Sequence, residues 1–210
     1  MFGIVHYEAF LLTAIMLNLI PGTDTMYIIS RSIAQGRRAG IQSVFGILTG
    51  SLIHTLLAAF GLSMLLAQSL LLFTIVKILG VAYLVYLGVR MFLTKEPLSM
   101  DRAATQHANT EKVYWQGVLT SLTNPKVALF FIAFLPQFVS TSDAGALPFL
   151  LLGLTFTVTG GIWCSIIALF ASFATAKLRS NPKISVVLNK LTGVVFIGMG
   201  LNLLRAKATP

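Results

Sequence analysis

The sequence has few charged residues, and the acidic ones are the scarcest. Only 10% of its 210 residues are charged, with 6 Asp and Glu against 15 Lys and Arg, while 56% are hydrophobic. A soluble domain carries about 25% charged residues. Because so little polar surface cannot cover a water-facing exterior, lipid is the natural solvent for the apolar excess. The composition excludes an ordinary soluble domain and predicts an integral membrane protein.

Cysteine and histidine are also scarce, which excludes several chemistries. The single cysteine, Cys164, rules out an intramolecular disulfide framework and a CxxC redox pair. The three histidines, His6, His54 and His107, are scattered, and no cluster of metal-ligand types stands out. No GxSxG or HExxH motif is present, and only Asp24 places a carboxylate well inside an apolar run. We therefore expect no enzyme activity, no metal site and no cofactor.

The positive net charge does not indicate a nucleic-acid partner. The formal net charge is +9 at pH 7, which in a soluble protein would suggest binding to nucleic acid. Here the basic residues lie in short segments between apolar runs, where they set the orientation of a membrane protein. We therefore expect a lipid bilayer and no nucleic acid as the surroundings of this chain.

Six apolar runs have about the 20-residue length that crosses a bilayer. They cover residues 7–29, 41–66, 70–92, 114–138, 147–173 and 186–204. No basic segment precedes the first run, and Pro21 and Asp24 interrupt it where a signal-peptide cleavage site would be needed, so we expect it to be retained. The sequence predicts an all-α membrane protein with six transmembrane helices in a single domain, residues 1–210.

Lysine and arginine are distributed unevenly between these runs. They occur after the first, third and fifth runs, and the segments after the second and fourth runs hold none. By the positive-inside rule, the basic segments are cytoplasmic, including a loop of about residues 94–113, and both termini face outward. Arg205 and Lys207 in the tail oppose this orientation but are outnumbered.

The cytoplasmic loop divides the chain into halves of about residues 7–93 and 114–204. Each half has three predicted helices, and because three is odd the second half enters the membrane from the opposite side. This inverted-topology repeat is common among secondary transporters. The first helix of each half is broken by proline, at Pro21 and at Pro125. Matching interruptions of this kind point to a transport site.

The motif around Pro21 is the first candidate site. Pro21 lacks a backbone donor and Gly22 allows unwinding, so carbonyls near Asn18 need partners in protein, water or a ligand. Asp24 follows directly, and a carboxylate inside a bilayer costs at least ~2.5–3.5 kcal/mol on insertion scales. Two interpretations stay open, namely a cap on the half-helix after the break and a role in binding substrate and protons.

The motif Asn124-Pro125-Lys126 is the second candidate site. Lys126 lies too deep in its apolar run for its ammonium to reach the near surface easily. It would neutralise a carboxylate, either that of a substrate or, in a structural ion pair, that of Asp24. On straight helices the two residues differ in depth by about 13 Å, so contact requires tilt or the two breaks.

The second predicted helix contributes a histidine beside a glycine motif. Gly46 and Gly50 form a GxxxG pair that lets another helix approach closely. His54 follows near mid-membrane, where it would serve as a proton relay or as a neutral hydrogen-bonding group between helices. Small-residue faces allow a homodimer without requiring one.

Five segments in order along the chain point to a family. They are PGTD, SRSIAQGRRAG, GILTGSLIH, LGVAYLVYLG and SLTNPK. Together they resemble the LysE/RhtB amino-acid exporter family over roughly residues 9–204. The resemblance implies a small bacterial inner-membrane exporter of amino acids that uses the proton gradient. It also implies that the site lies in the two regions around Pro21 and Pro125.

Two residues depart from the pattern of that family. Thr23 stands where many relatives have proline, and Ser51 stands where many have aspartate. The second departure leaves the helix without a carboxylate, so His54 would take any proton role of that position.

The resulting hypothesis is export of a small amino acid by proton antiport. The carboxylate of the substrate would bind to Lys126 and to a half-helix N-terminus. Its ammonium would bind to Asp24 and to the carbonyls near Asn18. The proton would be carried by Asp24 or His54. Because the runs hold few charges, neutral cargo such as threonine, homoserine or leucine is favoured over lysine or arginine. The alternatives are an exporter of another small solute or of a metal ion on the same plan, and a structural subunit.

Overall fold

The computed structural model describes residues 3–64, 70–93, 109–140 and 145–171, with Lys190, Val194 and Ile197. Within these residues the regular elements are helices, apart from one isolated β-bridge between Ile4 and Val139. The sixth predicted run and most of the predicted 94–113 loop lie outside the described residues. The prediction of an all-α protein is confirmed for the part of the chain that is described.

The helices follow the apolar runs, with bounds as follows. They are α1 Tyr7–Leu19, α2 Thr23–Gln35, α3 Arg37–Leu57, α5 Leu70–Leu93, α6 Thr110–Leu122, α7 Pro125–Leu129 and α8 Ala146–Ala171. A π-helical turn, η1 (Ala58–Leu62), extends α3, and a π-helical and a 3-10 turn, η3 (Phe130–Phe134) and η4 (Leu135–Phe138), extend α7.

Two described helices are long and apolar enough to cross a membrane alone. They are α3 with η1, Arg37–Leu62, and α8. Two further pairs meet the same test only together, α1 with α2 and α6 with Pro125–Phe138, and each pair is bent by 46° at its break. The described residues thus contain two candidate spans, or up to four if each bent pair is one span. The chain is a multi-pass membrane protein.

Helix α3 packs against α2, α6 and α8. Its contact with α6 is close because glycines face each other, and a Cβ on Gly117 would lie 3.0 Å from the carbonyl oxygen of Ser43 and 3.2 Å from Gly46 Cα. A Cβ on Gly50 would lie 2.6 Å from Ser121 Cβ. The glycine pair in α3 therefore serves as the helix-packing motif that the sequence predicted.

Aromatic side chains fill the part of the bundle between α1, η3, η4 and α8. The rings of Phe130 and Phe156 stack with centroids 4.2 Å apart, and Phe10 meets Phe138 edge-on at 5.3 Å. Beside this cluster, Val5 N donates to Phe138 O at 2.9 Å. Burial of such large rings makes this one of the two apolar cores of the described chain.

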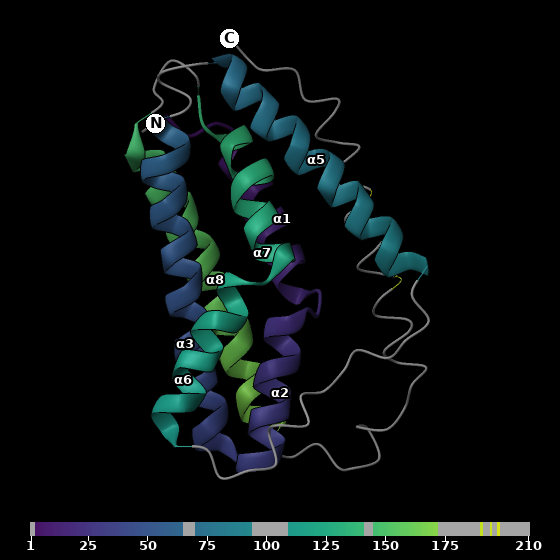
Figure 1. Ribbon diagram of the computed structural model, residues 1–210. Coiled ribbons are helices and arrows are strands. Elements are labelled where there is room, and N and C mark those ends of the chain that lie inside the picture. The colour runs from purple at the N-terminus through teal and green to yellow at the C-terminus, as the bar shows by residue number, and fades with distance from the viewer. Residues whose placement is uncertain are drawn as a thin grey trace.

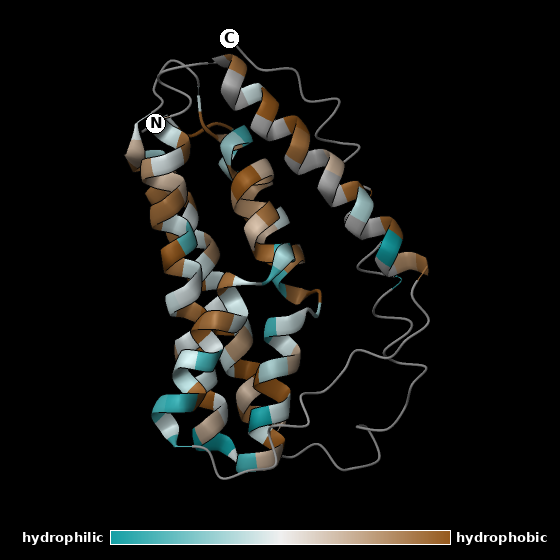
Figure 2. Cartoon of the chain, in the orientation of Figure 1, coloured by the Kyte–Doolittle hydropathy of each residue, from teal (hydrophilic) through white to brown (hydrophobic). Residues whose placement is uncertain are grey.

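The helix breaks lie at a similar height in the bundle (Figure 1). In that view α1 and α2 run from the upper end to the lower end, α6 and α7 run back in the opposite direction, and α3 and α8 extend along both parts (Figure 1). Hydrophilic residues gather at the lower end, where α2 ends and α6 begins (Figure 2). The breaks therefore lie inside the apolar part of the molecule, away from its polar end.

Candidate functional site at two helix breaks

The first break separates α1 from α2. Helix α1 cannot continue through Pro21, because proline has no N–H and its ring clashes with the preceding turn. The missing N–H would have bonded the carbonyl four residues earlier, which is that of Leu17. Gly22 then adopts an extended conformation, with φ −135° and ψ −166°, and is the N-cap of α2.

Lys126 of α7 supplies the hydrogen bonds that the first break lacks. Its Nζ donates to Leu17 O at 3.2 Å and to Ile20 O at 2.8 Å. Its carbon chain passes over Gly22, where a Cβ would lie 3.3 Å from Lys126 Cε. A lysine from the second half of the chain thus caps the C-terminal end of the first half-helix, where the helix dipole favours a cation.

The second break separates α6 from α7 and is capped by its own residues. The Asn124 side chain accepts a hydrogen bond from Lys126 N at 3.0 Å, and Pro125 takes the first position of α7. This position suits proline, because the N–H it lacks would have no partner in the helix. The carbonyl that Pro125 leaves free, Ser121 O, accepts from Asn124 N at 3.1 Å and contacts His54 Nε2 at 3.3 Å.

His54 of α3 lies at the second break and does not line the cavity described below. Its ring stacks on Phe131 with centroids 5.6 Å apart, and it is 9% exposed. Because Ser121 O is an acceptor, the Nε2 of His54 donates in this contact. The hydrogen bond between helices that the sequence offered for His54 is therefore present, and its proton role stays a prediction.

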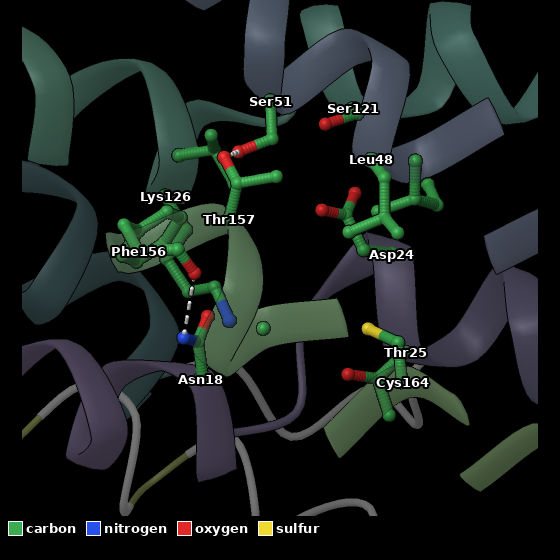
Figure 3. Close-up of a pocket in the computed structure, with 13 residues that line it drawn as sticks. Asn18, Asp24, Thr25, Leu48, Ser51, Ser121, Lys126, Phe156, Thr157 and Cys164 are labelled. Atoms are coloured by element: carbon green, nitrogen blue, oxygen red, sulfur yellow. Dashed lines mark hydrogen bonds between the residues drawn. The ribbon is translucent and has the colours of Figure 1, made fainter. Parts of the chain in front are cut away.

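A cavity lies where α1, α2, α3, α6, α7 and α8 meet (Figure 3). Its polar lining residues are Asn18, Asp24, Thr25, Ser51, Ser121, Lys126 and Thr157. The remaining lining residues are Ile47, Leu48, Val127, Phe156, Gly160 and Cys164. The sequence predictions Asn18, Asp24 and Lys126 are thus brought together, whereas Pro21, Gly22, Asn124 and Pro125 shape the backbone around the cavity.

Asp24 projects into this cavity from the first turn of α2 (Figure 3). It is 8% exposed, and its Oδ1 makes no hydrogen bond. Since Gly22 is the N-cap of α2 and no side chain caps that end, the interpretation of Asp24 as a capping residue is wrong. Oδ1 is thus left without a partner inside the membrane, which is costly unless a ligand or water meets it.

Among the described residues, Asp24 and Lys126 form no ion pair. Lys126 directs its ammonium to the two carbonyls of α1 and is 7% exposed. The structural ion pair offered by the sequence is therefore wrong. Both charges nevertheless line the same cavity, so the cavity presents a negative and a positive group at once.

Helix α8 and Ser51 contribute residues that the sequence predictions did not assign to the site. Thr157 Oγ1 lies 2.8 Å from Ser51 Oγ, and Asn18 Nδ2 donates to Thr159 Oγ1 at 3.0 Å. Gly160 leaves room at this wall, because a Cβ there would lie 3.1 Å from Asn18 Oδ1. The signal was the series of threonines and glycines within the otherwise apolar residues 147–173.

Hydrogen bonds join the first and second halves of the chain on both sides of the cavity. At the polar end, Tyr27 Oη donates to Val113 O at 2.6 Å, and Arg31 Nη2 donates to Gln116 Oε1 at 2.7 Å. At the other end, Tyr7 Oη and Thr155 Oγ1 lie 3.3 Å apart. No group of three or more His, Cys, Asp or Glu in the described ranges is placed to hold a metal ion.

Comparisons with known proteins bear on nearly the whole chain. The family model for LysE type translocators matches residues 15–207. A leucine efflux protein of Salmonella typhimurium is 31% identical, with 96% of each chain covered. An uncharacterised membrane protein of Vibrio cholerae is 36% identical, over 95% of this chain and 97% of its own. An uncharacterised membrane protein of Bacillus subtilis is 33% identical, over 92% of this chain and 95% of its own. No solved structure gives a significant match.

Proposed function

The chain belongs to the LysE type translocator family, and from this premise we propose that it is a secondary transporter that exports small neutral amino acids, leucine among them, by proton antiport. The single observation that carries the proposal is the cavity at the helix breaks. It combines the carboxylate of Asp24, whose Oδ1 has no hydrogen-bond partner, with the ammonium of Lys126. Such a pair of opposite charges suits a zwitterion, whose ammonium and carboxylate need complementary partners away from water.

The apolar part of the cavity supports a neutral cargo. Ile47, Leu48 and Phe156 provide its hydrocarbon surface, and Asp24 and Lys126 are the charged residues among its lining. A cationic cargo side chain would need a further carboxylate. The name of the Salmonella relative, a leucine efflux protein, agrees with a branched aliphatic cargo.

The first half of the chain would receive the ammonium of the substrate. In this proposal its acceptors are Asp24, which lines the cavity, and the carbonyls near Asn18, which lie at the end of the broken helix α1. Pro21 and Gly22 keep that end open by preventing α1 from continuing.

The second half would receive the carboxylate of the substrate. Lys126 is its cationic partner, and Asn124 and Pro125 fix the turn that carries Lys126. From the first half, the N-terminus of α2, which no side chain caps, adds backbone donors for the same carboxylate.

We further propose the membrane arrangement that this mechanism needs. Each bent pair is one span, and with α3, α5, α8 and the run of residues 186–204 these make six spans in one domain. The halves 7–93 and 114–204 are an inverted 3+3 repeat, supported by the opposite directions of α1–α2 and α6–α7 (Figure 1). The polar end and the predicted loop of residues 94–113 face the cytoplasm, and both termini lie outside a bacterial inner membrane.

Transport would proceed by movement of the two halves about the cavity. The hydrogen bonds at the polar end would break to admit cargo, and those at the other end to release it. A proton taken up by Asp24 or His54 from outside would return the empty protein to its inward-facing form.

Export from cells loaded with leucine-containing dipeptides tests the proposal. With the protein present, leucine efflux is expected to accelerate, and a protonophore is expected to abolish the acceleration. Lysine-containing dipeptides serve as the matched cationic cargo and are expected to show no acceleration. Unchanged efflux of every amino acid, with the protein verified in the membrane, would contradict the proposal.

A further inference from the structure

The end of α1 forms a place for a cation inside the membrane. Leu17 O and Ile20 O lack partners in α1 itself, and the C-terminal end of a helix carries partial negative charge. The carboxylate of Asp24 lines the cavity that Lys126 also lines, and its Oδ1 has no hydrogen-bond partner. Backbone carbonyls in a bilayer must be satisfied, so these acceptors require a donor in every state of the protein.

In this structure the donor is the ammonium of Lys126. It forms hydrogen bonds to Leu17 O and Ile20 O, and its charge interacts with that of Asp24 without forming an ion pair. A lysine ammonium has three donors in tetrahedral arrangement. The α-ammonium of an amino acid has the same three donors, the same charge and nearly the same size.

We propose that Leu17 O, Ile20 O and Asp24 form a subsite for primary ammonium groups, which Lys126 fills as an internal ligand until the α-ammonium of the cargo takes its place. The inference rests on the proposed function and adds to it an order of events. The cargo ammonium displaces Lys126 from the carbonyls, and only then is the Lys126 ammonium free to meet the cargo carboxylate. Recognition of the carboxylate therefore depends on prior recognition of the ammonium.

This exchange has a physical advantage inside a membrane. The carbonyls of α1 are not left without a donor when the cavity is empty, so the empty protein avoids the cost of leaving them unsatisfied. Loading with a zwitterion leaves the net charge of the cavity unchanged. An amino acid with a blocked amino group would lack the donors needed to displace Lys126, and the site would reject it.

Removal of the lysine side chain tests whether the subsite exists. We expect purified Lys126→Ala protein to be stabilised by propylammonium, which replaces both the ammonium and the lost carbon chain, with a rise of several degrees in its unfolding midpoint. Wild type and Lys112→Ala, a matched substitution of an exposed lysine on α6, are expected to show a clearly smaller rise, because the ammonium of Lys126 competes for the subsite. The double variant Asp24→Asn with Lys126→Ala is expected to lose the response.

The same assay is able to overturn the proposal. An equal response of Lys126→Ala and Lys112→Ala to propylammonium, or no response of either, would show that no ammonium subsite lies at the end of α1. The result does not depend on transport, so it separates failure of the subsite from failure of the export function.

A second measurement uses the wild-type protein and covers the case in which Lys126→Ala does not fold. Cys164 lines the cavity and is the single cysteine of the chain, so its rate of reaction with a thiol reagent reports on ligands there. We expect isopentylammonium, which is leucine without its carboxylate, to change this rate, and isocaproate, which is leucine without its ammonium, to leave it unchanged. A change with isocaproate alone, or no change with isopentylammonium, would overturn the exchange.

Discussion

The two helix breaks share one design and differ in what they leave unsatisfied. Each is bent by 46°, and in each the carbonyl that proline deprives of its partner is contacted by a basic side chain of the other half. Lys126 Nζ bonds Leu17 O at the first break, and His54 Nε2 contacts Ser121 O at the second. At the second break, Asn124 also caps the following half-helix, whereas no side chain caps α2 at the first.

This difference separates two helix breaks that both arise from a proline. At the second break the backbone groups are satisfied, because Asn124 caps α7 and Ser121 O accepts hydrogen bonds, so no backbone group there remains for a ligand to bind. The first break instead relies on a lysine of the other half and lies beside Asp24, whose Oδ1 has no hydrogen-bond partner. We therefore propose the first break as the one that binds ligand, because it lacks local partners, whereas proline is common to both breaks.

Among the substitutions that test this comparison, Asp24→Asn is expected to have the largest effect on export. The amide keeps the shape of the side chain but removes the charge that the first break offers to an ammonium. Since a hydrogen bond to a charged group contributes about 1.5–3 kcal/mol, leucine export is expected to fall about 10- to 100-fold. Initial efflux rates in loaded cells measure this loss.

Glu8→Gln is the matched control for that experiment. Glu8 is an exposed acidic residue in the first turn of α1, and its neutralisation is expected to leave export unchanged. Wild-type rates in a folded, inserted Asp24→Asn protein would remove the distinction between the two breaks.

Asn124→Ala has an intermediate expected effect, on stability. It deletes the cap of α7, in which Asn124 Oδ1 accepts from Lys126 N. Loss of an N-cap side chain costs about 1 kcal/mol, so the unfolding midpoint of the purified protein is expected to drop. Asn124→Ser restores a capping oxygen and is expected to recover most of the loss. If serine and alanine behaved alike, the second break would not depend on its own cap.

Ser121→Ala has the smallest expected effect and tests whether the second break contributes to the cavity. Ser121 is fully buried, lines the cavity, and its hydroxyl oxygen has no hydrogen-bond partner. Removing an unsatisfied buried hydroxyl relieves a desolvation cost of about 1–3 kcal/mol, so stability is expected to hold or rise. Leucine export is expected to fall by less than about tenfold, the value of one neutral hydrogen bond. A marked drop in the unfolding midpoint would show that this hydroxyl is structural.

The sequence located both breaks because the cause is local. Pro21 and Pro125 cannot donate the hydrogen bonds that a continuous helix needs, whatever surrounds them. Hydropathy likewise located the helices, because length and apolar content alone decide which segments suit a bilayer. The run at 186–204 and most of the 94–113 loop fall outside the described residues, so the prediction of six spans is untested.

The partners at the breaks could not be predicted, because they depend on helix placement in three dimensions. A depth difference of about 13 Å between Asp24 and Lys126 assumed straight helices, and the bends bring both side chains to one cavity. The wall formed by Thr157 and Gly160 was missed for a related reason. A threonine in an apolar helix is able to satisfy its hydroxyl on its own backbone, so its position alone does not reveal that it faces a cavity.

The backbone contact between α3 and α6 has a mechanical consequence. Side chains at an interface absorb displacement by changing rotamer, but Gly46 and Gly117 meet without side chains. A displacement of either helix therefore displaces the other, and we expect the pair to move as one rigid unit.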